Sequence, residues 1–447
     1  MSFSRTSLGF WAAAIAGLTL AAGCENKPTG ASGQAGASGQ AGVTGASGTT
    51  GTAGTGTAGT GAAGTGAAGT GKAGTTGAAG SGSDGGAGTN GQAGSMGDGG
   101  APPVGTCTPP ADMSKPIQKL SQTGCVDPKN PTTFASIVQP YEVNSPLWSD
   151  GADKSRGFVI PAGKKIHVKD CTATPTECPQ GAQDDGKWVM PVGTVMVKTF
   201  GFDGKLVETR LLVHPDADTW NGYSYQWDEA QTDATVVPDD ADLVPINMRR
   251  KVTFNTGKRM VDWVYPYRFD CTGCHTQPAG GTLGPETRQM NRDTTIANVK
   301  MNQMDRFKAL FDNTPKMVPA LVLPYDGQLG TVPATATIEQ RARSYMHANC
   351  AYCHRPDGGP VNWLDFRFDT TLKNTGACGQ PPMKGDVGVT GSLILKPTKP
   401  MESAIWLRMN AAPSEGKTRM PQLATYVVDA QGLKLIGDWI TSITACP

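Results

Sequence analysis

The sequence predicts an α+β protein in which a disordered tether, a β-rich region and a helical domain follow one another along the chain. Three observations support this prediction. Residues 24–105 consist almost wholly of Gly, Ala, Thr and Ser. Residues 106–268 contain short apolar runs separated by Gly, Pro, Asn and Asp, which is typical of a β-sandwich. Beyond residue 268 apolar residues recur at helical spacing, above all in the stretch 334–447.

The first 23 residues are predicted to be a lipoprotein signal peptide. An apolar run follows Arg5 and is shorter than the roughly 20 residues that span a bilayer. It ends in Leu20-Ala-Ala-Gly-Cys24, which resembles the lipobox of bacterial lipoproteins, so Cys24 is expected to carry a lipid anchor. An ordinary signal peptide cut near Ala22 is the alternative. With Glu25 next to the cysteine, we expect an exported lipoprotein of a Gram-negative outer membrane, facing the periplasm or the cell surface.

The tether of residues 24–105 contains almost no large apolar side chains. Such a segment cannot bury a core, so it is predicted to be disordered. A flexible chain of this length has a root-mean-square reach of about 45–50 Å. It would hold the folded part of the protein away from a membrane.

The charges of the chain exclude one class of partner. There are 39 Lys and Arg residues against 38 Asp and Glu residues, and the formal net charge is +1. The two signs are scattered and form no basic stripe, so nucleic acid is not an expected partner.

Strands are predicted where apolar runs alternate with turn residues such as Asp203-Gly204. The predicted strands are 157–160, 187–190, 194–200, 207–213, 223–227 and 251–254. Helices are predicted over 302–311 and 429–443, where apolar residues share one face. Thr337 and Gln340 form a capping box that opens a third helix, which runs into Cys350.

The chemistry of the chain is indicated by two copies of one pattern, Cys271-Thr-Gly-Cys274-His275 and Cys350-Ala-Tyr-Cys353-His354. Both match C-x-x-C-H, the attachment signature of c-type haem. Two thiols bond to the two vinyl groups of one porphyrin, so they must project from a single turn. The adjacent histidine then supplies the proximal ligand of the iron.

Zinc is the main competing interpretation, because two C-x-x-C pairs can hold Zn²⁺ with four thiolates. A zinc site does not need a histidine directly after each pair, and here both pairs have one. Haem attachment is therefore the favoured prediction, with two covalently bound haem c groups as the cofactors.

The remaining cysteines predict disulfides. The chain has 11 cysteines; one is assigned to lipid and four to haem, which leaves six. An even number in an exported protein favours three disulfides. Proximity in the sequence favours Cys107–Cys125, Cys171–Cys178 and Cys378–Cys446, one of fifteen possible connectivities.

The second haem is expected in a class I cytochrome c-like domain over residues 334–447. Here His354 would bind the iron on one side and Met420, which lies before Pro421, on the other. His/Met ligation raises the reduction potential. Pro360 is either the carbonyl partner of the His354 ring or a simple turn residue.

The first haem is assigned to the segment 269–333, with His275 as the proximal ligand. No Met-Pro pair follows at a suitable distance. Met290, His347 and His214 are the candidates for the sixth ligand, and a vacant sixth position is the fourth possibility.

Four stretches together resemble a family of bacterial di-haem c-type cytochromes, many of them lipoproteins. They are Asn144-Ser-Pro-Leu-Trp-Ser-Asp-Gly-Ala-Asp-Lys154, Pro191-Val-Gly-Thr-Val-Met-Val-Lys198, Glu208-Thr-Arg-Leu-Leu-Val213 and Tyr345-Met-His-Ala-Asn-Cys-Ala-Tyr-Cys-His354. The resemblance covers about residues 139–439. It implies two covalent haems, held by the two C-x-x-C-H motifs, and no particular enzyme activity.

The expected function is therefore that of a membrane-anchored one-electron carrier that works with redox partner proteins and has no small-molecule substrate. Two alternatives remain open. One is a peroxidase-like enzyme that uses an open first haem. The other is a surface-binding module with accessory haems, suggested by the aromatic residues Trp220, Tyr223, Tyr225 and Trp227.

Overall fold

A six-stranded antiparallel sheet lies at the centre of the β-rich region. The computed structural model describes residues 106–110, 112, 114–238, 251–296, 298–325, 335–359, 363–412, 419–423 and 425–447. All of them lie in one compact unit, residues 93–447. Cys24, the segments predicted as signal peptide and tether, and Pro360 lie outside the described residues. The presence of both helices and sheets confirms the α+β class.

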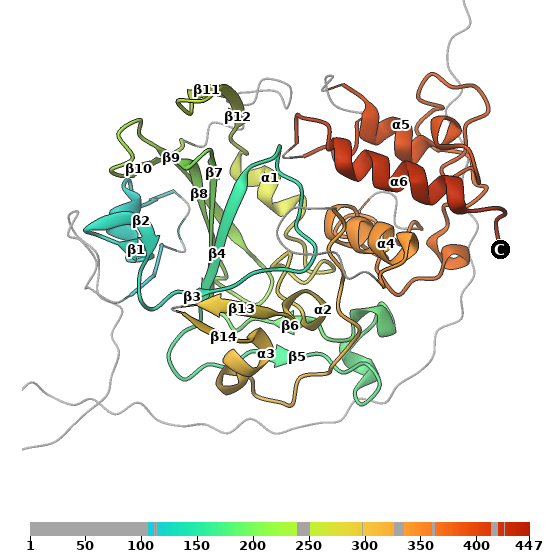
Figure 1. The fold of residues 1–447 in the computed structure, drawn as a ribbon. Coiled ribbons are helices and arrows are strands. Elements are labelled where there is room, and N and C mark those ends of the chain that lie inside the picture. The colour runs from blue at the N-terminus through green and yellow to red at the C-terminus, as the bar shows by residue number, and fades with distance from the viewer. Residues whose placement is uncertain are drawn as a thin grey trace, which may run out of the picture. The chain divides into compact units, whose positions relative to one another are not determined.

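The strands of this sheet follow the order β10-β9-β8-β7-β4-β3 (Figure 1). Their bounds are β3 Gln139–Pro140, β4 Asp153–Val159, β7 Val195–Phe202, β8 Lys205–Val213, β9 Asn221–Trp227 and β10 Ala234–Val236. Strands β7 and β8 are joined by Asp203 and Gly204, which both have positive φ. Two such residues form the tight turn that suits a β-hairpin.

The two faces of the sheet are packed differently because side chains alternate along each strand. One face carries Val197, Leu211 and Tyr225, which form a buried core with the N-terminal segment around Leu120 and Cys125. That segment contains the short 3₁₀-helix Leu120–Thr123 and the strands β1 Val126–Asp127 and β2 Asn130–Phe134. The opposite face carries two separate apolar clusters with a polar row between them, and this polar row faces the functional site described below.

The prediction of a sandwich needs correction. In the described part of the chain, every sheet other than the central one has two strands. The remaining pairs are β1–β2, β5 His167–Val168 with β6 Trp188–Val189, β11 Lys251–Asn255 with β12 Met260–Val264, and β13 Asp293–Ile296 with β14 Val299–Asn302. Hairpins and loops cover the central sheet, because the segments around it are too short and too interrupted to form a second broad sheet.

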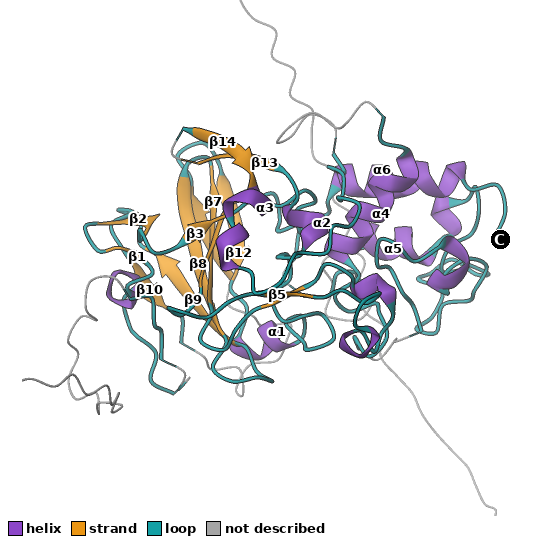
Figure 2. Cartoon of the chain, turned by 90° about the horizontal axis from the view of Figure 1, so that it is seen from below, coloured by secondary structure: helices purple, strands orange, loops and turns teal. Residues whose placement is uncertain are grey.

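The helices are α1 Arg268–Thr272, α2 Thr287–Met290, α3 Gln303–Arg306, α4 Ile338–Asn349, α5 Ala404–Asn410 and α6 Ala430–Ser442. Figure 2 shows α4, α5 and α6 gathered apart from the strands of the central sheet. Their shared core contains Tyr345, Met346, Ile436 and Trp439.

The capping box of α4 is confirmed. The Gln340 amide donates to the Thr337 hydroxyl at 3.1 Å, and the Thr337 amide donates to the Gln340 side chain at 2.9 Å.

The helix predicted over 302–311 is shorter than expected. It divides into α3 and a 3₁₀ turn, Lys308–Leu310. The helix ends early because the residues that follow it pair with Ile166. The Ile166 amide donates to the Leu310 carbonyl at 2.8 Å, and the Asp312 amide donates to the Ile166 carbonyl at 3.1 Å. The apolar residues that suggested a helix still pack inward, since Met304, Phe307 and Phe311 are buried.

The three predicted disulfides are confirmed as Cys107–Cys125, Cys171–Cys178 and Cys378–Cys446. Within the described residues, no helix combines the length and the apolar character needed to cross a membrane.

Candidate haem-attachment sites

The two C-x-x-C-H motifs have the same backbone turn. In each motif the amide of the second cysteine donates to the carbonyl of the first at 3.2 Å, and the histidine amide donates to that carbonyl at 2.9 Å. Cys271 lies within α1, and Cys350 caps the end of α4. The turn brings two thiols and one imidazole to neighbouring positions, as attachment of one porphyrin requires.

The four motif cysteines are not disulfide-bonded, and all four are half-buried. Burial raises the pKa of Cys350 to about 12, so this thiol stays protonated at neutral pH. Among the described residues, no three His, Cys, Asp or Glu side chains converge on a point that could hold a metal ion. The four thiols therefore do not form the tetrahedral arrangement that the zinc interpretation requires.

His275 is oriented by a loop that follows the first motif. Its Nδ1 donates to the Gly281 carbonyl at 2.6 Å. Gly281 has a positive φ, and a Cβ at this position would lie 2.1 Å from Trp220 Nε1, so only glycine fits beneath the indole. Burial lowers the pKa of His275 to about 4, which keeps the imidazole neutral. A neutral ring with Nδ1 bound to a carbonyl presents Nε2 as the ligand atom.

His354 has different surroundings. Its ring packs edge-on against Phe366, with the centroids 5.3 Å apart. Burial lowers its pKa to about 4. Its Nδ1 is buried and has no hydrogen-bond partner among the described residues, and the predicted partner Pro360 lies outside them.

The two motifs touch each other, which their separation in the sequence did not predict. Cys274 hydrogen-bonds to Cys353, and this contact holds the pKa of Cys353 below its ordinary value, at about 7. The Cys353 thiol also lies 3.7 Å from the Gly273 carbonyl. Arg355, directly after the second motif, donates to the Pro278 carbonyl at 2.8 Å.

The loop that contains Met420 is anchored beside these motifs. The Met420 amide donates to the Arg408 carbonyl at 3.0 Å, and the buried Arg419 donates to the Val427 carbonyl at 2.8 Å. A Cβ at Gly273 would lie 2.9 Å from Leu423 Cδ1, so the loop lies against the first motif. Met420 itself is half-buried, and its ligation of the iron opposite His354 stays a prediction.

The three side chains predicted as sixth ligands of the first haem have distinct environments. Met290 is fully buried in an apolar cluster with Trp188 and Phe307. His347 is engaged at both ring nitrogens, since Nε2 lies 2.7 Å from Glu286 and Nδ1 accepts from the Phe368 amide at 3.0 Å.

His214, the third candidate, stacks on Trp220 with the ring centroids 4.2 Å apart. Its Nδ1 lies 3.2 Å from the Pro191 carbonyl. This is the same type of contact that orients His275, and Nε2 is therefore the nitrogen that His214 can offer to a metal.

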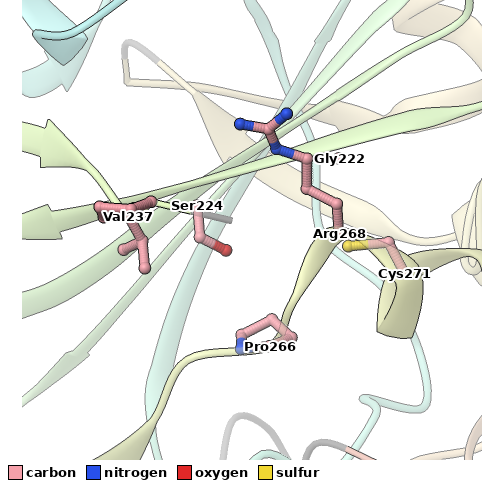
Figure 3. Close-up of a pocket in the computed structure, with 7 residues that line it drawn as sticks. Gly222, Ser224, Val237, Pro266, Arg268 and Cys271 are labelled. Carbon is pink, nitrogen blue, oxygen red and sulfur yellow. The ribbon is translucent and has the colours of Figure 1, made fainter. Parts of the chain in front are cut away.

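Two pockets border the motifs. The first is a space of about 220 Å³ lined by Gly222 and Ser224 of β9, by Val237 and by Arg268 and Cys271 of α1 (Figure 3). The second, about 280 Å³, lies beside the loop after His275 and is lined by Lys187, Glu286, His347 and Arg355, among others.

Two features of the site were missed in the sequence. One is the buried Glu286–His347 pair. The other is a row of cations on the central sheet, formed by Arg156, Lys198 and Arg210. The only sequence signal was a charged residue inside otherwise apolar strands, and this signal does not show which residues become neighbours.

Comparisons with known proteins give no further identification: no protein-family profile, no curated protein and no solved structure matches the chain.

Proposed function

We propose that the protein is a di-haem c-type cytochrome that carries single electrons, anchored to a membrane through a lipid on Cys24. The observation that supports this most is the shared turn of the two C-x-x-C-H motifs, each with two cysteines that form no disulfide and with a neutral histidine. When bound, haem supplies reversible one-electron exchange.

Each haem would be held by two cysteines and one histidine. Cys271 and Cys274 hold one porphyrin, and Cys350 and Cys353 hold the other. His275 and His354 are the proximal ligands. The Gly281 carbonyl fixes the ring of His275 and makes it a stronger electron donor, as partners of metal-bound histidines commonly do.

The contact between the motifs supports a relay rather than two independent centres. Cys274 and Cys353 meet across 79 residues of sequence (353 − 274). Attachment points this close keep the two groups near each other, so an electron that enters at one can pass to the other before it leaves the protein. Met420 would be the sixth ligand opposite His354 and would favour the reduced iron.

The test counts haems in paired variants. Wild-type protein purified from a host that matures c-type cytochromes should contain two haems per chain, measured by mass and by the absorbance of the pyridine complex. The pair Cys271→Ala/Cys274→Ala and the pair Cys350→Ala/Cys353→Ala should each leave one. The matched control Cys171→Ala/Cys178→Ala removes a disulfide and should keep two. A wild-type mass equal to polypeptide plus lipid would overturn the proposal.

A peroxidase-like enzyme is the second candidate. The Glu286–His347 pair favours it, because this pair lines the pocket beside the loop that follows His275. Burial alone would raise the pKa of Glu286, but the hydrogen bond from His347 and the charges of Arg288 and Lys187 outweigh burial and hold it at about 2. Carbon monoxide binding to one haem of the reduced protein would support this candidate, and no binding would support the carrier.

The surface-binding alternative loses its main support. The four aromatic residues that suggested it are all buried: Trp220, Tyr223, Tyr225 and Trp227. They cannot stack on a sugar without unpacking the sheet. The expected partners are therefore redox proteins and the membrane, in the periplasm or at the outer surface.

A further inference from the structure

A row of three cations crosses one face of the central sheet. Arg156 of β4 is directly opposite Lys198 of β7, and Lys198 is directly opposite Arg210 of β8. All three side chains are half-buried. Like charges placed directly opposite each other on neighbouring strands destabilise a sheet.

Among the described residues, only Arg210 of this row forms an ion pair. Arg210 forms a bidentate pair with Glu208, at 2.7 and 2.8 Å, and Glu208 also accepts from Trp263 at 2.9 Å. Lys198 lies over the Phe200 ring at 5.0 Å. Neither Arg156 nor Lys198 forms a side-chain ion pair or hydrogen bond with another described residue. The nearby Glu142 is paired with Arg292 at 2.9 Å. Within the part of the chain that the structure describes, Arg156 and Lys198 therefore have no carboxylate partner, and Lys154, whose Nζ donates to the Leu147 carbonyl at 3.1 Å, adds a further positive charge near Lys198.

The row lies close to both C-x-x-C-H motifs. The charges of Lys198 and Arg210 add to burial in lowering the pKa of His275. Arg156 lies close enough to Tyr352, in the second motif, to oppose the rise that burial causes in the pKa of the Tyr352 hydroxyl. At the β9 end, Arg210 is opposite Ser224, which lines the pocket beside Cys271 (Figure 3). A group attached at the motifs would therefore lie close enough to contact the row.

Charges that are partly removed from water, like those of this row, destabilise the fold unless a partner of opposite sign meets them. Burial and the neighbouring charges of Arg156, Lys154 and Arg210 hold the pKa of Lys198 well below its ordinary value. The row therefore favours binding of an anion with two negative charges, or of two anionic groups that are as far apart as side chains on neighbouring strands.

We propose that Arg156 and Lys198 bind the propionate carboxylates of a haem attached at these motifs. The inference rests on the proposed function and names the residues that hold the anionic edge of the cofactor. A porphyrin of this type has two propionates, whose negative charges would meet the cations of this row. A free oxyanion such as phosphate has similar chemistry, and the experiment separates the two sources.

The test compares Lys198→Met with Lys198→Arg in haem-loaded full-length protein. The control is Lys205→Met, which removes an exposed lysine of β8. In Lys198→Met a propionate loses its partner, so we expect a lower unfolding temperature, a lower reduction potential for one haem, and shifted carboxylate bands in the infrared redox difference spectrum. Lys198→Arg and Lys205→Met should stay close to wild type.

An unfolding temperature of Lys198→Met that is not lower than that of wild type would overturn the inference. If the row had no anionic partner, Lys198→Met would relieve repulsion, and the variant would be at least as stable as wild type with both potentials unchanged. Stabilisation of wild type by inorganic phosphate, lost in Lys198→Met, would assign the row to a free oxyanion and would also overturn the inference.

If Lys198→Met does not fold, the same measurements on Arg156→Met test the inference. Loss of both haems from wild type would contradict the proposed function itself, whereas unchanged variants with two haems would contradict only the role of this row.

Discussion

In the first motif the Nδ1 of His275 is bound to the Gly281 carbonyl, whereas in the second the Nδ1 of His354 has no partner among the described residues. The first motif lies next to a sheet with a row of cations, and the second ends a helix within an apolar core. The backbone turns are nevertheless the same. The five-residue pattern therefore determines the turn, while the surrounding fold determines hydrogen bonding and charge. Since those factors set reduction potentials, we expect the two haems to differ in potential.

The variant with the largest expected effect tests whether the surroundings of the two motifs are independent of each other. Trp439 is 2% exposed in the core that surrounds the second motif. Trp439→Ala should cost about 3–5 kcal/mol of unfolding free energy, because truncation of a buried tryptophan leaves a cavity. Denaturant unfolding followed by absorbance should show that the second haem changes and the first keeps its spectrum.

Trp227→Ala is the matched control. Trp227 is also 2% exposed, but it lies in the core on the sheet face opposite the cation row. Its loss should cost a similar free energy and leave the spectra of both haems in the folded state unchanged. Equal spectral changes in the two variants would mean that the surroundings of the two motifs are not separate.

Removal of single disulfides compares how much stability each of the two regions gains from restriction of the unfolded chain. The Cys378–Cys446 bridge closes a loop of 68 residues in the helical part, and Cys171–Cys178 closes one of 7 residues beside the sheet. Loop-closure entropy predicts losses of about 4 and about 2 kcal/mol for the paired alanine variants. Calorimetry would measure both, and a larger loss for the short loop would contradict the entropic account.

The sequence predicted local features better than contacts between distant segments. The runs 194–200 and 207–213 correspond to β7 and β8, and Thr337 begins α4 as its capping box predicted. These features depend on residues a few positions apart. The pairing of Arg156 with Lys198, and the contact of Cys274 with Cys353, depend on how strands and loops fold back over 42 and 79 residues (198 − 156 and 353 − 274). No local pattern determines such a register.

The sandwich prediction was wrong for a related reason. Strand periodicity shows that one face of a strand is buried, but it does not show what buries it. On the central sheet, hairpins and loops around residues such as Trp263 and Trp188 fill that role. The identity of the covering segment is a tertiary property.

The Glu286–His347 pair connects the two regions, because Glu286 follows the loop of the first motif and His347 lies on α4. The pKa of Glu286 is held at about 2, below its ordinary value of 4.5. A lowered carboxyl pKa contributes stability that is present above about pH 4.5 and is lost as the pH falls towards 2. We expect wild type to lose on the order of 3 kcal/mol across this window.

Glu286→Gln should lack that part of the pH dependence, measured by urea unfolding at a series of pH values. The exposed Glu339→Gln, at the start of α4, is the control and should behave as wild type. Parallel curves for wild type and Glu286→Gln would mean that this carboxyl does not contribute to acid sensitivity.

The last prediction concerns the orientation of His275. Gly281→Ala forces a Cβ to within 2.1 Å of Trp220 Nε1 at a φ of 73°. Gly204→Ala places a Cβ at a φ of 88° with no atom within 4 Å, so it measures backbone strain alone, about 1–2 kcal/mol. The difference between the two variants is the cost of overpacking, about 2 kcal/mol. Because the Gly281 carbonyl accepts from His275, only Gly281→Ala should also shift the absorbance and potential of the first haem, leaving the second unchanged. A shift at both haems would show that the hydrogen bond to His275 does not distinguish the two sites.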